Sequence, residues 1–289
     1  MRLIADSGST KTDWVMMNDA GICRRFQTQG INPFHQSEDD VTAILRYELL
    51  PQLSCSTASQ PLKVSFYGSG VRVELEPLME RLLRQALPQA MAVEAHGDLL
   101  GAARAVCGES EGIACILGTG ANSGLYDGRQ LVANTPPLGY ILGDEGSGAV
   151  LGIRFLNALY KGFMPVSLMT DFQHDINMPM ADIINRVYRQ PLANRFLASL
   201  SPFIHRHLAT PQVRTLVVGC LREFFSRNVR QYQRTDLPVG FVGSIASSYA
   251  DCLKEAAMAE GFVLGRVMKS PMEGLVEYHR EHHEKPGVS

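Results

Sequence analysis

Residues 2–11 read RLIADSGSTK, an apolar run that ends in Asp6 and passes into a polar turn with one glycine. The β-branched, aromatic and apolar residues at 12–17 predict a second strand after that turn. A turn signal at residues 18–21 lets residues 22–28 return as a third strand. The chain is therefore predicted to open with a strand, a glycine turn, a strand, a second turn and a strand.

The same order of signals occurs again about 110 residues later. Residues 113–117 form an apolar strand-like run, residues 118–120 a glycine turn and residues 122–126 a second strand. Asp127-Gly128 is a strong hairpin signal before a return at residues 130–133. Glycine turns between strands are common, so chance is the alternative, but the repeat predicts two related domains.

The rest of the pattern alternates strands with helices and fits an α/β protein. Further strands are predicted at residues 63–67, 91–94, 239–242 and 262–268. Helices are predicted at residues 71–87, 98–106, 145–161, 181–188, 194–207, 213–231, 246–260 and 271–283. Because no low-complexity linker is present, we expect a tight domain boundary near residue 110.

Composition narrows the class of protein. The chain has 289 residues, 45% of them hydrophobic and 19% charged, which is typical of a globular protein. A formal net charge of −2 offers no basic field for nucleic acid, and no apolar run reaches the roughly 18 residues needed to span a bilayer. The six cysteines lack disulfide or zinc spacing, and an aspartate comes too early for a signal peptide. We therefore expect a cytoplasmic protein without nucleic-acid or membrane partners.

The first glycine turn is a candidate phosphate site. Gly8 would let backbone N–H groups approach a phosphate closely, and Ser9, Thr10 and Lys11 would add donors. Asp6, at the end of the predicted strand, could hold Mg²⁺ through water. The alternative is a hairpin turn with ordinary polar residues.

The second turn, Gly118-Thr119-Gly120, is a weak signal alone because G-x-G is common. Together with the first turn it predicts two facing loops that hold one polyphosphate between two domains. The chain has neither a Walker A loop nor a G-x-G-x-x-G run after a strand.

Carboxylates beside glycines at two places in the chain are candidates for sugar chemistry. Asp98 follows Gly97 and opens a predicted helix, so it is either a helix cap or a base that accepts a hydroxyl proton. Asp144 and Glu145 lie among three glycines and could bind sugar hydroxyls or merely favour a helix start.

A last candidate lies where a predicted strand meets a helix. Gly243, Ser244 and the nearby Ser248 are small enough for an adenine ring to lie flat on the backbone. An ordinary strand-to-helix turn explains the same residues.

The order of these motifs resembles the N-acetylglucosamine kinase family, which belongs with the ATPase activators of benzoyl-CoA reductase and 2-hydroxyacyl-CoA dehydratases. The resemblance covers nearly the whole chain, and the Gly-Asp-Glu-Gly-Ser run at residues 143–147 is its most specific part. It is clearest at residues 6–11, 30–33, 97–98, 118–120, 142–147 and 243–244.

This resemblance implies an actin-like fold of two ribonuclease-H-like domains with a cleft between them. We expect residues 1–110 and a C-terminal helix at 271–289 in one domain, and residues 111–270, with a helical insertion, in the other. The resemblance also implies Mg-ATP as phosphoryl donor and makes a homodimer plausible.

The resemblance assigns roles to single residues. Asp98 is expected to be the catalytic base. The ATP-binding set is Asp6 (also the Mg²⁺ ligand), Gly8, Ser9, Thr10, Lys11, Gly118, Thr119, Gly120, Gly243, Ser244 and Ser248. The sugar-binding set is Asn32, Pro137, Leu138, Gly139 and Asp144 together with Asp98. Leu138 stands where human-type enzymes have a tryptophan near the sugar, which leaves the exact sugar open.

The sequence therefore predicts ATP-dependent phosphorylation of an amino sugar, with N-acetylglucosamine at its 6-hydroxyl favoured and N-acetylmuramic acid and glucosamine left open. One alternative is an ATPase activator that moves a partner, and another is an actin-like scaffold without catalysis. Cys107 and Cys115 flank the region where activators hold an iron–sulfur cluster but lack a paired pattern, which disfavours that role.

Overall fold

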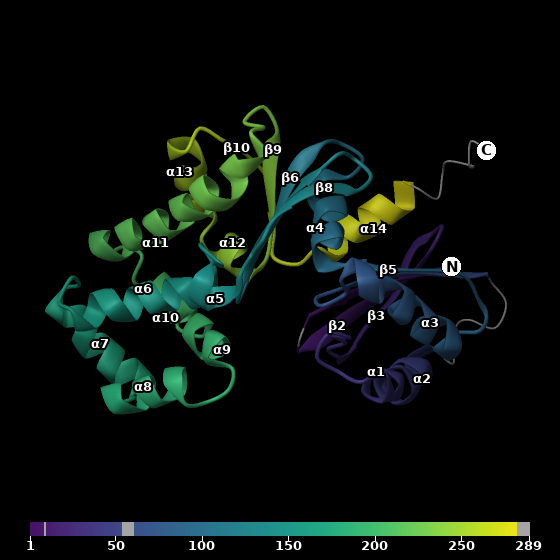
Figure 1. Cartoon of the computed structure of the whole chain (residues 1–289), viewed down its shortest axis with the longest axis horizontal. Coiled ribbons are helices and arrows are strands. Elements are labelled where there is room, and N and C mark those ends of the chain that lie inside the picture. The colour runs from purple at the N-terminus through teal and green to yellow at the C-terminus, as the bar shows by residue number, and fades with distance from the viewer. Residues whose placement is uncertain (9, 54–60, 282–289) are drawn as a thin grey trace. The chain divides into compact units, whose positions relative to one another are not determined.

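The computed structural model describes residues 1–8, 10–53 and 61–281. The chain divides into two compact units (Figure 1). Unit 1 comprises Met1–Glu109 and the segment that begins at Pro271, and unit 2 comprises Ser110–Ser270. The described part of each unit contains a five-stranded mixed sheet with helices.

The sheet of unit 1 has the order β3-β2-β1-β4-β5. Its strands are β1 (Arg2–Ser7), β2 (Lys11–Asn18), β3 (Gly21–Gln29), β4 (Leu62–Gly68) and β5 (Ala90–Gly97). Strands β1, β4 and β5 are parallel, and β2 is antiparallel to both β1 and β3. The carboxyl ends of β1, β3, β4 and β5 therefore lie at one edge of the sheet, which we call edge 1.

Helices cover both faces of this sheet. They are α1 (Glu38–Ile44), η1 (Leu45–Leu49), α2 (Leu50–Leu53), η2 (Val73–Leu75), α3 (Glu76–Ala86), α4 (Asp98–Cys107) and α14 (Met272–Glu281). Leu3 and Ala5 join a core with side chains of α1, η1 and α3, and Phe66 belongs to the same core. Because side chains alternate along a strand, Tyr67 points to the opposite face, where α4 packs against β1 and β4 and α14 packs against β1 and β2.

The sheet of unit 2 has the order β10-β9-β6-β7-β8. Its strands are β6 (Gly112–Leu117), β7 (Ala121–Tyr126), β8 (Leu131–Thr135), β9 (Pro238–Val242) and β10 (Val263–Met268). Strands β6, β9 and β10 are parallel, while β7 is antiparallel to β6 and β8. This is the order and direction of unit 1 with β6 in the place of β1, so the predicted duplication is confirmed.

Most helices of unit 2 lie between β8 and β9. They are α5 (Gly139–Leu142), α6 (Gly148–Tyr160), α7 (Val166–Ile176), α8 (Met180–Tyr188), α9 (Ala193–Ala198), α10 (Ser201–Arg206), α11 (Pro211–Phe224), η3 (Phe225–Val229) and η4 (Arg230–Tyr232). Two more, α12 (Ser244–Ser248) and α13 (Ala250–Ala259), connect β9 to β10. The rings of Phe155, Phe172 and Phe203 pack against one another, with centroids 5.3–5.9 Å apart, and hold α6, α7 and α10 together.

Several predicted helices have different bounds. The helix expected at 194–207 is two helices, α9 and α10, and the one expected at 246–260 is broken at Tyr249. Tyr249 is buried, and its hydroxyl donates to the carbonyl of Ser201, so a tertiary contact fixes the break. The sequence pattern does not predict helices α1, α2, α5 and α7.

Within the described ranges, no helix is both long and apolar enough to cross a bilayer.

Candidate active site

The first glycine turn is tied to the segment that follows β3. The amide of Gly8 donates to the carbonyl of Lys11 over 3.0 Å, which closes the turn. The hydroxyl of Ser7 donates to the carbonyl of Ile31 over 2.9 Å, and the amide of Ile31 donates back to that hydroxyl over 3.0 Å. The turn therefore lies beside residue 32 at edge 1. Ser9, predicted as a phosphate contact, lies outside the described residues.

The two predicted donors that follow Ser9 differ in their surroundings. Thr10 is exposed, and its carbonyl accepts a hydrogen bond from the amide of Gly30. The ammonium of Lys11 pairs with Asp13 over 2.9 Å, and 57% of the Lys11 side chain is exposed. The Thr10 backbone is therefore fixed, while the Lys11 ammonium already has a carboxylate partner.

Asp6 lies one residue before the end of β1. It is opposite Tyr67 in the register of β1 and β4, which places it on the sheet face covered by α4. Magnesium in phosphoryl-transfer sites usually binds one or two carboxylates, phosphate oxygens and water. A single carboxylate at the end of β1, beside a turn of backbone N–H groups, fits that donor set.

Asn32 is held by its own loop. Its side-chain oxygen accepts from the backbone amide of Phe34 over 3.1 Å, and its own backbone amide donates to Gln36 Oε1 over 2.7 Å. Gly70 packs so closely against the Asn32 side chain that an added Cβ would overlap the carboxamide. Asn32 therefore contacts the loop Gly68–Val71, which follows β4.

Asp98 follows Gly97, which contacts the same loop at Val71. Gly97, the last residue of β5, packs closely against this loop, because a Cβ added to Gly97 would lie 3.0 Å from the carbonyl oxygen of Val71. The half-buried Asp98 then begins α4. Burial raises the pKa of the Asp98 carboxyl above its ordinary value, although hydrogen bonds from the amides of Leu99 and of Asp98 itself oppose the shift. Edge 1 thus brings Asn32 and Asp98 together around one loop.

The loop Gly68–Val71 was missed as a site element in the sequence. The amide of Ser69 donates to the carbonyl of Ser7 over 2.8 Å, so the loop also touches the first glycine turn. The Ser69 hydroxyl is buried and has no hydrogen-bond partner among the described residues. The signal was available, because Gly68-Ser69-Gly70 follows a predicted strand as the other glycine turns do.

In unit 2 the second glycine turn packs on the first turn of α6. The amide of Gly118 donates to the carbonyl of Gly120 over 3.0 Å. The carbonyls of Gly118 and Thr119 accept from the amides of Gly148 and Ala149 over 2.8 and 3.2 Å. Thr119 is exposed, so this packing does not bury it.

Asp144 lies directly against this second turn. Its Oδ2 is 3.0 Å from the position that a Cβ on Gly120 would occupy. Burial raises the pKa of Asp144 to about 6, the Glu145 charge adds to the shift, and a hydrogen bond from the amide of Ala121 opposes it. Unit 2 therefore joins the second glycine turn and the Gly143–Gly148 segment into one site.

The predicted sugar-binding run Pro137 to Gly139 adjoins Asp144. The amide of Asp144 donates to the carbonyl of Pro137 over 2.9 Å. Leu138 and Asp144 both have left-handed backbones, with φ of 59° and 54°. Such a conformation costs roughly 1–3 kcal/mol for a residue other than glycine and concentrates at functional sites. Leu138 is 63% exposed, so its side chain does not form the core.

The third motif of unit 2 begins at Gly243. Its φ is +129°, and an added Cβ would overlap the carbonyl oxygen of Leu117, the last residue of β6. Ser244 and Ser248, at the two ends of α12, are exposed. All three motifs of unit 2 therefore meet around the carboxyl end of β6, which we call edge 2.

Two cavities adjoin α5 and α6, which lie on either side of Asp144 in the chain. One of about 250 Å³ is lined by Gly143, Glu145 and Arg227 among others. The other, of about 550 Å³, is mainly apolar and lies among side chains of α5, α6, α8 and α9.

Comparisons with known proteins supply the family. No family model matches the chain, and no curated protein matches it. Among solved structures, the chain is 50% identical to a "putative N-acetylglucosamine kinase" from Porphyromonas gingivalis, over 98% of this chain and 100% of that one, with a TM-score of 0.93. The chain belongs to the N-acetylglucosamine kinase family. The predicted family, and with it the assignment as a sugar kinase, is confirmed.

More distant structures share the fold of this kinase family member. A "putative N-acetylglucosamine kinase" from Chromobacterium violaceum is 16% identical, over 96% of this chain and 98% of that one, with a TM-score of 0.63. A ROK family glucokinase from Streptomyces griseus, solved with glucose and AMPPNP, is 10% identical over 96% and 97% of the two chains, with a TM-score of 0.53. The predicted fold class, two actin-like α/β domains, is confirmed.

Proposed function

We propose that the chain transfers the γ-phosphoryl group of ATP to the 6-hydroxyl of N-acetylglucosamine. The observation that carries the proposal is the placement of Asp98, a half-buried carboxylate of raised pKa, directly after Gly97 at the loop Gly68–Val71, which Asn32 also contacts. The 50% identity to the Porphyromonas gingivalis structure supports N-acetylglucosamine as the acceptor.

In this proposal Asp98 accepts the proton of the 6-hydroxyl while that oxygen attacks the γ-phosphorus. The new bond joins the sugar oxygen to phosphorus, the bond to the β–γ bridging oxygen breaks, and ADP leaves. A base whose pKa lies closer to the working pH takes the proton more effectively, and such a base contributes roughly 10²–10⁴-fold to the rate. Burial of Asp98 supplies that shift.

Asn32 and Asp144 bind sugar hydroxyls in this proposal, and Pro137, Leu138 and Gly139 line the sugar beside Asp144. The carboxamide of Asn32 is fixed by Gly70 and the Phe34 amide, so it needs little reorganisation to bind.

ATP is bound by the two glycine turns and the start of α12. Thr10 and Thr119 contact phosphates, and so do the backbone amides near Gly8, Gly118 and Gly120. Gly243, Ser244 and Ser248 contact the nucleoside, while Ser9 and Lys11 supply further phosphate donors. Asp6 would hold Mg²⁺ through water, and such an ion would supply neutralisation of phosphate charge.

The experiment is a coupled ADP-release assay with Mg-ATP and a panel of N-acetylglucosamine, N-acetylmuramic acid, glucosamine and glucose, with a control lacking sugar. We expect ADP to form only with an acceptor and N-acetylglucosamine to give the highest kcat/KM. Another sugar at the top of the panel would correct the substrate. An equal rate without sugar would replace the kinase by an ATPase of the activator type.

A further inference from the structure

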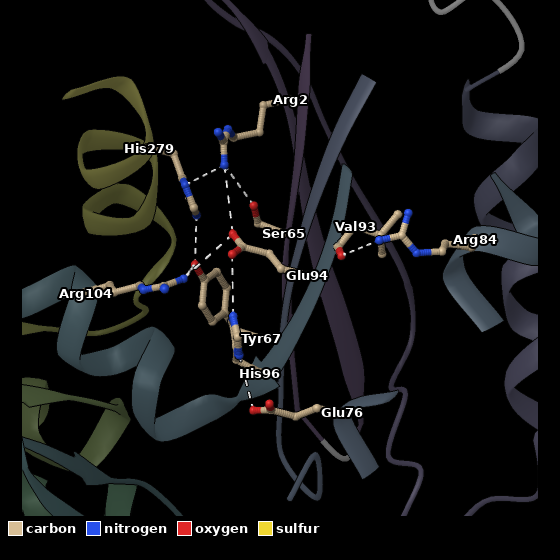
Figure 2. A network of polar contacts seen from close by, with 10 residues as sticks. All are labelled: Arg2, Ser65, Tyr67, Glu76, Arg84, Val93, Glu94, His96, Arg104 and His279. Carbon is tan, nitrogen blue, oxygen red and sulfur yellow. Dashed lines mark hydrogen bonds and ion pairs between the residues drawn. The ribbon is translucent and has the colours of Figure 1, made fainter. Parts of the chain in front are cut away.

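A buried polar network in unit 1 lies between the sheet and helices α4 and α14 (Figure 2). It connects β1, β4 and β5 to both helices through Arg2, Tyr67, Glu94, Arg104 and His279. None of these residues belongs to the motifs assigned to ATP or sugar. The network has a direct structural relation to Asp98, because α4 begins at Asp98 and carries Arg104.

Asp98 depends on α4 for its position. Its carboxylate accepts hydrogen bonds from the amides of Asp98 and Leu99, so the first turn of the helix orients it. The N-cap residue, Gly97, has no side chain that could fix the helix start. Any shift or rotation of α4 therefore moves the carboxylate.

Tyr67 anchors α4 to the sheet. A Cβ on Gly101 of α4 would lie 2.9 Å from Cβ of Tyr67, so helix and strand are in close contact there. One turn further along, Arg104 donates to the Tyr67 hydroxyl over 2.6 Å. From the other side, Gly274 of α14 packs against the carbonyl of Ala105 without room for a Cβ.

His279 of α14 completes the anchor, and its neighbours define its tautomer. Figure 2 shows the imidazole between Arg2 and Tyr67. Arg2 Nη1 lies 2.8 Å from Nδ1, and a guanidinium can only donate, so Nδ1 is the acceptor. Nε2 therefore carries the hydrogen and donates to the Tyr67 hydroxyl over 2.9 Å. The Tyr67 oxygen thus receives one hydrogen bond from α4 and one from α14.

Glu94 supplies the negative charge of the network. Its carboxylate lies 4.0 Å from Arg2, 3.7 Å from Arg104 and 3.5 Å from His96. Burial opposes its ionisation, but hydrogen bonds from His96 and Ser65 and the charge of Arg104 lower the pKa of Glu94 to about 2. The carboxylate is therefore ionised at any pH at which the enzyme would work.

The composition of the network indicates a role in geometry more than in stability. Two guanidiniums share one carboxylate, and the Nε atoms of Arg2 and Arg104 are buried without a hydrogen-bond partner among the described residues. Apolar side chains of similar volume would often stabilise such a site as well or better. Directional hydrogen bonds, in contrast, fix the rotation and height of α4 on the sheet.

We propose that Tyr67, Arg104 and His279 form a positioning unit that sets the placement of α4 and hence of the Asp98 carboxylate. Arg104 follows Asp98 by six residues, about 9 Å along the helix axis, so it acts through the helix. This proposal rests on the proposed function of Asp98. A misplacement of about 1 Å at a reacting group can cost on the order of 10²-fold in rate.

The test compares Tyr67→Phe and His279→Gln in the full-length chain with wild type. Tyr67→Phe removes one hydroxyl that receives two hydrogen bonds. Its matched control is Tyr232→Phe, which removes a hydroxyl that contacts Ser123 Oγ at 2.7 Å and the Thr135 amide at 3.0 Å in unit 2. Sugar-dependent kcat, both KM values and the thermal midpoint are measured for each, at a temperature where every variant is folded.

We expect Tyr67→Phe and His279→Gln to lower kcat by about tenfold or more with both KM values within about twofold of wild type. The control keeps its kcat even if its midpoint falls. Because the two residues act as one unit, the double variant should be little slower than the slower single variant. A folded Tyr67→Phe with wild-type kcat, or with no greater loss than Tyr232→Phe, overturns the positioning role alone. A wild-type chain that forms no ADP in response to any sugar overturns the proposed function, and this role with it.

Discussion

At the scale of single residues, the two site aspartates have raised pKa values for one shared reason, burial, yet they differ in backbone and position. Asp98 is the first residue of α4 and has ordinary helical surroundings. Asp144 has a left-handed backbone and a carboxylate against Gly120. Asp98 is carried by a helix, and we propose it as the base. Asp144 is held in a loop with a left-handed backbone, and we propose it as a group that binds the sugar.

Asp98→Asn should fold like wild type and lose at least about a hundredfold in kcat. The amide oxygen can still accept the hydrogen bonds of the Asp98 and Leu99 backbone, so the helix start is kept. It cannot accept a proton, however, and a positioned base contributes roughly 10²–10⁴-fold. Steady-state kinetics beside a thermal melt decide the matter, and near-normal turnover in a folded variant would remove Asp98 from the base role.

The pKa of about 6 at Asp144 predicts an acid limb in the pH profile. Below that pH the carboxyl is protonated and is a poorer acceptor for sugar hydroxyls, so kcat/KM for the sugar should fall as pH decreases through 6 and level off above it. Asp144→Asn should lower kcat/KM at neutral pH and remove this limb. If the limb persisted unchanged in Asp144→Asn, a different group, such as Asp98, would be responsible.

The sequence predicts some residues of the candidate site and of the buried network in unit 1, but not others. Asp98 and Asp144 stand beside glycines, so their type and spacing were readable in the chain. The partners of His279 were not, since Arg2 lies 277 positions away and Tyr67 lies 212 positions away, and nothing local marks either one. The loop Gly68–Val71 is an intermediate case, because its two glycines mark a turn in the sequence but do not by themselves assign it to the site.

At the scale of elements, the same feature, a glycine after a strand, serves two physical purposes. Gly243 is required by packing, because its φ is +129° and a Cβ would meet the Leu117 carbonyl. A Cβ on Gly118 would instead stand in open space, with no atom of the described residues beyond its chain neighbours within 4 Å, and its φ carries no such restriction. An alanine at each of the two positions therefore distinguishes an effect on stability from an effect on ligand binding.

Gly118→Ala should leave the thermal midpoint unchanged and raise KM for ATP with little effect on KM for the sugar, because its methyl group would occupy space that a phosphate needs. Gly243→Ala should instead lower the midpoint markedly, since the backbone must shift to relieve the overlap. Melting curves and ATP titrations of both variants test this pair. An unchanged ATP dependence in Gly118→Ala would count against a phosphate at the second turn.

Elements were predictable where local pattern suffices. The strands of both sheets were located because apolar runs ended at turns with glycine or asparagine, and the repeat of that pattern gave the duplication. The helical part of unit 2 was harder, because a tertiary hydrogen bond from Tyr249 to Ser201 breaks a run that has continuous helical spacing. Helix α1 starts at a capping box of Ser37 and Asp40 that was present in the sequence and overlooked.

At the scale of the whole molecule, the chain begins in unit 1, forms unit 2 and returns to unit 1 with α14. Leu275 and Val276 of this last helix are buried, and His279 reaches the buried network. Burial of each such aliphatic side chain is worth roughly 1.5–3 kcal/mol. Helix α14 therefore stabilises unit 1, although it lies at the other end of the sequence from residues 1–109.

A chain that ends at Ser270 should lose stability in unit 1 first. Trp14, the single tryptophan, is buried in that unit, so its fluorescence reports on unit 1 without a signal from unit 2. We expect the thermal midpoint of unit 1 to fall by many degrees in the chain that ends at Ser270. A chain that ends at Glu281 keeps α14 as far as Glu281 and serves as the control. Equal midpoints for the two truncated chains would show that α14 does not support unit 1.

The reaction itself gives the most direct test of the whole assignment. The chain is incubated with Mg-ATP and N-acetylglucosamine, ADP is quantified, and the position of the phosphate on the sugar is determined by phosphorus–proton NMR correlation. The account predicts one N-acetylglucosamine 6-phosphate for each ADP and almost no ADP when the sugar is left out. ADP formed at the same rate without sugar, or no phosphorylated sugar at all, would contradict it.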